Sequence, residues 1–299
     1  MSLVVVGSVA LDTIETASGA RERVLGGAAC FFSVAAMQFT DVKLVGIIGD
    51  DFPEEHVRML ADRGVDLAGL ERTPGKTFHW HGRYAADFSS RESLATELGV
   101  FAGFSPELPA AYREARTLFL ANIHPELQAN VCQQMTNPRL IGCDTMDFWI
   151  NGEPKALART LSMVHLLTIN DEEACLLSGE HNVVRAARAV LRMGPKYLVV
   201  KRGEHGALLF VDDEIFALPA LPLDRVVDPT GAGDTFAGGM LGWLDAADAV
   251  DSASLRQGVA YGTASASFNV SEFSLDGLLT STRPDLDARF ESLRQLVSF

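Results

Sequence analysis

The most informative segment of this chain reads Asp228-Pro229-Thr230-Gly231-Ala232-Gly233-Asp234-Thr235-Phe236-Ala237-Gly238-Gly239-Met240. It is a loop of small residues followed by a helical pattern that extends to about Leu244. Gly231, Ala232 and Gly233 leave room for a ligand to approach the backbone. The amides of the loop and of the first helical turn can converge on one anion, and the helix dipole adds partial positive charge. The pattern therefore predicts an anion-binding loop at a helix start.

Asp234 places a carboxylate beside this predicted anion site. A helix start favours the ionised carboxylate, which makes Asp234 a candidate to accept a proton from a bound group. The alternative is that Asp234 only caps the helix, a common role for aspartate at that position. Asp228-Pro229-Thr230 in front and Gly238-Gly239 behind favour the functional interpretation.

Two other nucleotide-binding patterns do not fit the chain. A GxGxxG dinucleotide fingerprint would need glycine at position 236, which is Phe236. Gly75-Lys76-Thr77 ends like a Walker A loop, but the upstream glycine falls on Leu70. A nicotinamide-dependent oxidoreductase is therefore a poor hypothesis.

The rest of the chain alternates short apolar runs with helical patterns, which predicts an α/β fold with a mostly parallel sheet. The expected strands are 3–6, 42–48, 117–120, 140–143, 164–169 and 198–200. The expected helices are 26–39, 53–63, 125–136, 154–162, 171–178, 182–193 and one on the apolar face of 284–297. The runs 208–211 and 215–218 flank a turn, which predicts an antiparallel hairpin at one edge. Residues 77–101 break the rhythm and predict an inserted β flap.

The composition is that of a globular protein. The 299 residues are 47% hydrophobic and 21% charged, and the formal net charge of −14 disfavours nucleic-acid binding. The four cysteines have no metal-ligand spacing and are expected to be reduced and mostly buried. The chain has no apolar run of the roughly 18 residues that a membrane span needs, and its start does not resemble a signal peptide. We therefore expect a cytoplasmic protein without a membrane partner.

Residues 228–239 resemble the C-terminal signature of the PfkB (ribokinase-like) family of carbohydrate and nucleoside kinases. Four other segments resemble family motifs in the same order along the chain. They are Asp12 with Gly26-Gly27, Asn170-Asp171-Glu172-Glu173, Lys201 to Ala207, and Ala264 to Phe268. The resemblance runs from about residue 3 to 297 and implies a three-layer α/β/α fold. It also implies that residues 1–299 form one domain, with a small β lid at about 10–20 and 77–101.

The resemblance implies an ATP-dependent transfer of a phosphoryl group to a hydroxyl. Asp234 would accept the proton of that hydroxyl, and the loop of Gly231, Ala232 and Gly233 would stabilise the phosphoryl charge through backbone amides, including that of Asp234. Mg²⁺ would bridge the phosphates, with Asn170 and Glu173 supporting it through water.

The resemblance also assigns the surroundings of the nucleotide and of a cation. The nucleotide would be bordered by Lys201, Gly203, Gly206, Ala264 and Ser267. Asp228 and Thr230 match the positions at which the family often holds a monovalent cation such as K⁺.

The acceptor would be held by Asp12, Gly26 and Gly27. Many family members have asparagine at the position of Phe31, and an aromatic ring cannot replace its hydrogen bonds, so Phe31 would stack on a ring or fill space. Asn122 and Asp144 follow predicted strands and are candidate substitutes, with loop capping as the alternative.

The implied lid would exclude water from the reaction and could pair between two copies in a homodimer. Three lid residues that could touch the substrate are His79, Trp80 and His81, although Trp80 could equally serve in packing.

The leading hypothesis from the sequence is a kinase for a sugar or sugar derivative. A nucleoside kinase is the alternative within that class, because Phe31 and Trp80 could stack on a base. A non-catalytic nucleotide-binding regulator is the alternative from another class, although a binding protein gains nothing from a carboxylate beside phosphate.

Overall fold

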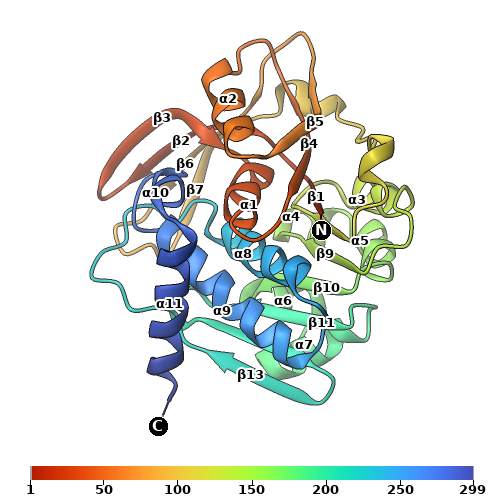
Figure 1. Ribbon diagram of the computed structural model, residues 1–299, viewed down its shortest axis with the longest axis vertical. Helices are drawn as coiled ribbons and strands as arrows, with labels where there is room; N and C mark the ends of the chain where they lie inside the picture. Colours follow the sequence, from red (N-terminus) through yellow and green to blue (C-terminus); the bar gives the residue numbers. More distant parts are fainter. Residues whose placement is uncertain (1, 299) are drawn as a thin grey trace.

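The computed structural model describes residues 2–298, in which nine strands form one sheet in the order β13-β12-β11-β10-β9-β8-β1-β4-β5 (Figure 1). The strands from β11 to β5 are paired in parallel, whereas β12 and β13 are antiparallel. The parallel strands are β1 (Leu3–Val6), β4 (Val42–Ile48), β5 (Asp66–Arg72), β8 (Thr117–Leu120), β9 (Leu140–Asp144), β10 (Leu166–Asn170) and β11 (Tyr197–Lys201). The edge hairpin consists of β12 (Ala207–Val211) and β13 (Glu214–Leu218). This arrangement confirms the mostly parallel sheet with one antiparallel edge.

Helices cover both faces of this sheet because its strands are apolar on both faces. Along β1, Leu3 and Val5 belong to one buried cluster, while Val4 and Val6 belong to another. The first cluster is covered by α1 (Ala28–Ala36), α2 (Glu54–Asp62), α8 (Ala232–Ala246), α9 (Ser252–Asn269), α10 (Asp276–Thr280) and α11 (Arg283–Leu296). The second is covered by α3 (Pro125–Cys132), α4 (Asp147–Gly152), α5 (Pro154–Leu161), α6 (Asp171–Ser178) and α7 (Val183–Leu191). The three-layer α/β/α fold is thereby confirmed.

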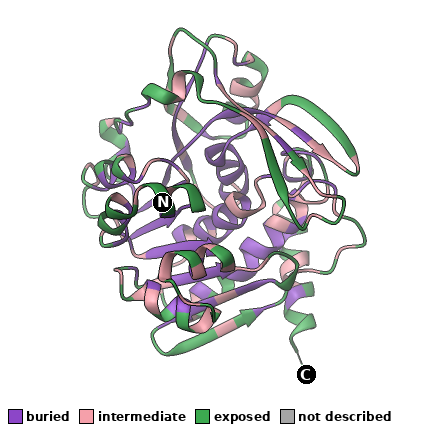
Figure 2. Ribbon diagram, turned by 180° about the vertical axis from the view of Figure 1, so that it is seen from behind, coloured by how far each residue is buried: buried purple, intermediate pink, exposed green. Residues whose placement is uncertain are grey.

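A second sheet of four strands, called the small sheet here, has the order β3-β2-β6-β7. Its strands are β2 (Ala10–Thr16), β3 (Gly19–Gly26), β6 (Phe78–Tyr84) and β7 (Arg91–Glu97). β2 pairs in parallel with β6, so segments far apart in sequence lie side by side. The strands of the small sheet project from the body of the molecule, and their outer parts are exposed (Figures 1 and 2). The strands of the predicted flap therefore belong to this sheet, and β3 extends it to Gly26.

The first helix begins later than its pattern predicts. Gly26 is the last residue of β3, and Gly27 has a positive φ of 91° at the N-cap of α1. A Cβ on Gly27 would lie 2.5 Å from the carbonyl oxygen of Ser8. The glycine pair therefore serves as a tight strand-to-helix connection and is not part of the helix.

Other boundaries and surface properties follow the expectations in part. The predicted helix at 125–136 ends at Cys132, and the pattern did not predict β5, α4 or α9.

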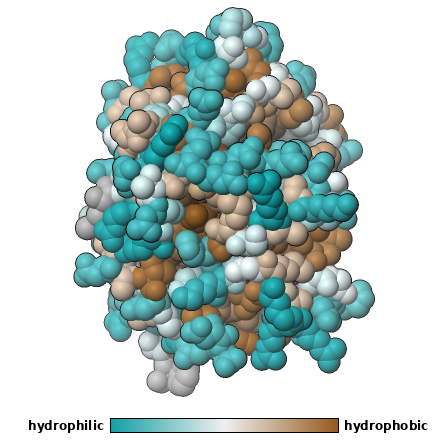
Figure 3. All heavy atoms as spheres, turned by 90° about the vertical axis from the view of Figure 1, so that its right-hand side faces the viewer, coloured by the Kyte–Doolittle hydropathy of each residue, from teal (hydrophilic) through white to brown (hydrophobic). Residues whose placement is uncertain are grey.

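All four cysteines are free, with three of them buried and Cys175 half-buried, as expected. Within residues 2–298, no helix is both long and apolar enough to cross a membrane. Hydrophilic side chains predominate on the face shown in Figure 3, around a hydrophobic hollow near its centre.

Candidate active site

The loop of residues 228–233, called the anion loop here, ends at the N-terminus of α8. Gly231 is the N-cap residue with a φ of 73°, and its carbonyl oxygen accepts a hydrogen bond from the Thr235 amide at 2.8 Å. A Cβ at Gly231 would lie 2.3 Å from the ring of Phe31. Both the backbone conformation and the space at this position therefore require glycine.

Asp234 is the third residue of α8 and is not its cap, because Gly231 occupies that position. Burial and then the charge of Asp144 raise the pKa of Asp234, Lys201 opposes this rise, and the net pKa is about 7. This corrects the expectation that the helix start would favour the ionised form, because loss of hydration outweighs the helix field. A carboxyl group that titrates near neutrality suits a general base.

The amides of the first helical turn differ in availability. The Ala232 amide donates to the Pro229 carbonyl at 3.2 Å, so this member of the predicted set is engaged in a turn. Gly233 and Asp234 belong to the first turn, whose amides have no acceptor within the helix. A Cβ on Gly233 would lie 3.0 Å from the Nζ atom of Lys201. The ammonium group of Lys201 therefore lies next to the anion loop.

Lys201 ends β11 and forms an ion pair with Asp144 at the end of β9, with 3.1 Å between Nζ and Oδ2. Burial lowers the pKa of Lys201, but the carboxylates of Asp144, Glu173 and Asp234 together raise it above its usual value. Lys201 is thus a retained positive charge beside the predicted phosphate site. The sequence motif had indicated only that Lys201 borders the nucleotide.

Asp12 on β2 is 4% exposed and lies against Gly26 of the neighbouring strand. A Cβ on Gly26 would lie 2.0 Å from Asp12 Oδ2, so only glycine leaves room for this carboxyl group. Burial is the main cause that raises the pKa of Asp12, the charges of Asp228 and Asp234 add to the rise, and the Gly27 amide opposes it, so the net pKa is about 7. The structure therefore brings Asp12 and Asp234 close enough for their charges to interact.

Asp228 and Thr230 hold the anion loop in place. Asp228 accepts hydrogen bonds from the Thr230 amide through Oδ1 and from the Ser274 amide through Oδ2, each at 2.9 Å. The Thr230 carbonyl accepts from Asn269 Nδ2 at 2.8 Å, and the Thr230 hydroxyl donates to the Tyr84 hydroxyl at 3.1 Å. Both carboxylate oxygens of Asp228 thus accept hydrogen bonds from backbone amides. Ser274, Asn269 and Tyr84 carry no local sequence motif, so only their position in the fold reveals them.

Asn170 and Glu173 form a capping box at the start of α6. Asn170 Oδ1 accepts from the Glu173 amide at 2.7 Å, and Glu173 Oε2 accepts from the Asn170 amide at 2.8 Å. Burial, followed by the charge of Asp144, raises the pKa of Glu173 to about 7. Both side chains of the predicted magnesium motif therefore stabilise the helix start.

The surroundings of Glu173 fit an ion that is held mainly by phosphate. Among residues 2–298, no group of three or more His, Cys, Asp or Glu side chains is placed to hold a metal. Mg²⁺ usually keeps several waters and binds one or two carboxylates together with substrate phosphates. The Thr145 hydroxyl beside Asp144 is buried and has no hydrogen-bond partner, so a polar ligand could satisfy it.

Two of the predicted acceptor residues have other partners. The ring of Phe31 is 1% exposed and packs beneath Gly231, so it fills space and does not offer a face for stacking. Asn122 accepts a hydrogen bond from Trp149 Nε1 at 2.9 Å and donates to Met146 Sδ at 2.9 Å. Asn122 therefore positions α4.

The predicted nucleotide border is spread over two elements. Gly203 and Gly206 have φ values of 51° and 87° in the turn between β11 and β12. Ala264 is completely buried in the core, and the Ser267 hydroxyl accepts a hydrogen bond from Arg289 of α11 at 2.6 Å. Ala264 thus serves packing, and Ser267 links α9 to α11.

The two histidines of β6 form hydrogen bonds with side chains of the neighbouring strand β2. His79 Nε2 lies 3.0 Å from Thr13 Oγ1, and His81 Nε2 lies 2.9 Å from Glu15 Oε1. Trp80 pairs in register with Asp12, and it packs with Val227 in a small apolar cluster next to the anion loop. The face with Trp80 is therefore the one turned toward the site.

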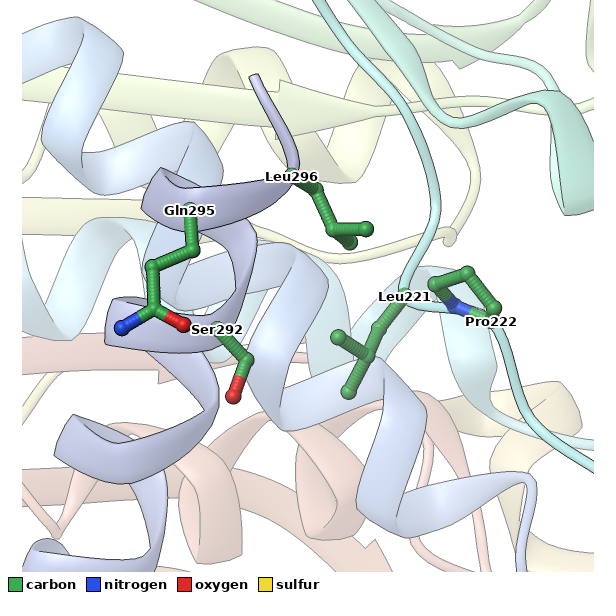
Figure 4. Close-up of a pocket in the computed structure, with 5 residues that line it drawn as sticks. All are labelled: Leu221, Pro222, Ser292, Gln295 and Leu296. Atoms are coloured by element: carbon green, nitrogen blue, oxygen red, sulfur yellow. The ribbon is translucent and has the colours of Figure 1, made fainter. Parts of the chain in front are cut away.

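A hollow of about 450 Å³ lies between α11 and the loop after β13 (Figure 4). It is lined by Leu221, Pro222, Ser292, Gln295 and Leu296. None of the predicted site residues lines this hollow. The candidate site is therefore assigned from the residues around the anion loop and not from this hollow.

Known proteins resemble this chain in sequence and in fold. The profile of the pfkB family carbohydrate kinases matches residues 1–281. A cytidine kinase from Thermococcus kodakarensis is 34% identical over 250 residues, which cover 81% of this chain and 87% of the relative. An aminoimidazole riboside kinase from Salmonella typhimurium is 25% identical over 85% of this chain and 84% of its own. The crystal structure of a nucleoside kinase from Methanocaldococcus jannaschii superimposes with a TM-score of 0.78 at 20% identity, covering 97% of this chain and 98% of the other.

Proposed function

The chain belongs to the pfkB family of carbohydrate kinases, and from this premise we propose that it transfers the γ-phosphoryl group of ATP to a hydroxyl of a ribonucleoside. The sequence motifs alone favour a sugar as the acceptor, with a nucleoside as the alternative. The order is reversed here because the cytidine kinase and the aminoimidazole riboside kinase, which both resemble the chain over most of its length, are named for acceptors with a ribose joined to a base.

The placement of Asp12 beside the anion loop carries the proposal, because Trp80, its in-register partner, packs with Val227 next to that loop. A carboxylate at Asp12 can accept hydrogen bonds from both neighbouring hydroxyls of a ribose. With the ribose held there, its remaining primary hydroxyl would face Asp234. Asp234 takes the proton as the hydroxyl oxygen attacks the γ-phosphorus, and the bond from that phosphorus to the bridging oxygen breaks to release ADP.

The charge that develops on the phosphoryl group is stabilised by the amides of Gly233 and Asp234 and by the ammonium of Lys201. Mg²⁺ bound with ATP would neutralise phosphate charge, and Glu173 and Asn170 are the residues that would hold it through water. K⁺ near Asp228 and Thr230 belongs to the same proposal, and replacing K⁺ by tetramethylammonium in the assay would reveal that requirement.

The small sheet acts as the lid in this proposal, and two copies pair through it in a homodimer, which light scattering would detect. A cytoplasmic location suits four free cysteines and an ATP donor.

The proposal is tested by measuring ADP release and phosphorylated product with ATP and Mg²⁺ across nucleosides and free sugars. We expect cytidine or another ribonucleoside to be phosphorylated with a higher kcat/KM than ribose or fructose. Preference for a free sugar would restore the first sequence hypothesis. Tight ATP binding without product from any acceptor would favour the non-catalytic regulator.

A further inference from the structure

The small sheet is joined to the anion loop by one side-chain hydrogen bond. The hydroxyl of Thr230 donates to the hydroxyl of Tyr84, the last residue of β6, at 3.1 Å. Beneath this bond, Val227 and Phe273 pack against Ile14, Trp80 and Tyr84 in an apolar cluster. The contact is therefore a packed junction with a polar link at its edge.

Thr230 has a partner for each of its polar groups. Its amide donates to Asp228, its carbonyl accepts from Asn269, and its hydroxyl donates to Tyr84. Asp228 and Asn269 belong to the main body of the protein, and Tyr84 alone belongs to the small sheet. The hydroxyl of Tyr84 thus adds a restraint that exists only while the small sheet rests on the loop.

Hydrogen bonds connect Thr230 to the first turn of α8. Asn269 accepts a hydrogen bond from Thr235 at 2.9 Å while it donates to the Thr230 carbonyl. Thr235 is the neighbour of Asp234 in the first turn of the helix. A shift of Thr230 would therefore disturb the segment that presents the amides of Gly233 and Asp234.

A cation on the same sheet supports this orientation of Tyr84. Arg91 of β7 pairs in register with Tyr84, and its guanidinium lies 5.6 Å from the centre of the Trp80 ring. The Trp80 ring is itself held by a hydrogen bond from its Nε1 to Ser93. Burial raises the pKa of Tyr84, whereas the hydrogen bond with Thr230 and the charge of Arg91 oppose that rise.

We propose that Tyr84 is a positioning residue that couples the small sheet to the anion loop, so that the phosphoryl-binding amides and Asp234 reach their working geometry when the sheet rests on them. The inference deepens the proposed kinase function and rests on it. Tyr84 exerts this effect through Thr230 and takes no part in the chemical step.

Tyr84→Phe is the direct test, because it keeps the ring in the apolar cluster and removes only the hydroxyl. We expect kcat to fall about tenfold while the KM for the acceptor changes less than twofold, since the lost bond acts on the loop. We also expect a larger share of ATP to be hydrolysed without transfer to the acceptor. Thr230→Val should have the same effect, and the double variant should be no worse than either single variant.

Tyr261→Phe serves as a matched control, because it removes a tyrosine hydroxyl that donates to Asp287 away from the loop. It should leave kcat and the ratio of hydrolysis to transfer unchanged. An active wild type with an unchanged Tyr84→Phe variant would overturn the inference while leaving the kinase proposal intact.

Amide hydrogen exchange provides a readout that does not depend on activity. The amides of residues 230–235 should exchange faster in Tyr84→Phe than in the wild type, and Tyr261→Phe should not change them. Equal exchange rates in these amides would contradict the inference even if the acceptor were still unknown.

Discussion

Asp12 shows how a residue proposed to bind the acceptor can oppose folding. Its carboxyl group is 4% exposed, and its pKa is raised from 3.8 to about 7. The unfolded chain releases this proton near pH 3.8, whereas the folded chain keeps it until about pH 7. The stability that the protonated form provides is therefore present at low pH and is lost as the pH rises through that window.

Asp12→Asn should stabilise the protein at pH 8 and impair its binding of acceptor. At pH 8 the variant lacks the buried charge, so its free energy of unfolding should exceed that of the wild type by about 4 kcal/mol, as the shift of the Asp12 pKa from 3.8 to about 7 implies. At pH 4 the difference should nearly vanish, because the folded wild type is then protonated. Urea unfolding at the two pH values measures this, and a variant less stable than the wild type at pH 8 would contradict it.

Gly231 is a second position at which one side-chain change should strongly affect the free energy of unfolding. Gly231→Ala should lower the free energy of unfolding by about 3 kcal/mol, because a methyl group would both strain the backbone and collide with Phe31. Gly179→Ala is the matched control: its φ of 72° is nearly the same, but its surroundings are empty. It should cost only about 1 kcal/mol. Equal losses in the two variants would show that the Phe31 contact is unimportant.

At the scale of elements, the carboxyl ends of β9 and β11 set the charge around Asp234. Burial is the main cause of the raised pKa of Asp234. The charge of Asp144 raises this pKa as well, and the charge of Lys201 lowers it. Asp144→Asn should therefore move the acid limb of the kcat profile to lower pH, and Lys201→Met should move it to higher pH, each by about one unit.

The control for this pair is Asp147→Asn, which removes a carboxylate that acts on Glu173. It should leave the acid limb in place. Shifts of both test variants in the same direction would exclude Asp234 as the group whose ionisation limits the rate.

The elements also show what could be predicted from the sequence. Apolar runs identified β1, β4 and β8 through β11, because strands buried on both faces are continuously hydrophobic. β5 was not predicted, because this edge strand is partly exposed and has a mixed composition. The expected Gly26–Phe39 helix was too long, because the positive φ of Gly27 and its contact with Ser8 are tertiary features.

Some features of the candidate site could also be predicted from the sequence, whereas others could not. The motif of residues 228–234 predicted the loop, and the structure places it at the N-terminus of α8. The pKa of Asp234 could not be predicted, because it depends on Asp144 from another strand. The partners of Asp228 and Thr230 lie at Ser274, Asn269 and Tyr84, far away in sequence and without a motif.

At the scale of the whole molecule, two sheets meet at the anion loop. The large sheet contributes Asp144 and Lys201 at its carboxyl edge, and the small sheet contributes Asp12 and Tyr84. Ligands of open α/β sheets bind outside the carboxyl ends of the strands, which agrees with this location. Both sheets therefore contribute residues to the proposed reaction centre.

If Asp234 accepts the proton of a ribonucleoside hydroxyl, its conversion to asparagine should stop the reaction without preventing ATP binding. Phosphorylation of the best ribonucleoside acceptor should be measured with ATP and Mg²⁺ for the wild type and for Asp234→Asn, with ATP affinity measured on the same samples. Asp234→Asn should retain the ATP affinity within about threefold and lose kcat by at least about a thousandfold, because the amide keeps the shape but cannot take a proton. A near-normal kcat in Asp234→Asn would show that Asp234 is not the proton acceptor.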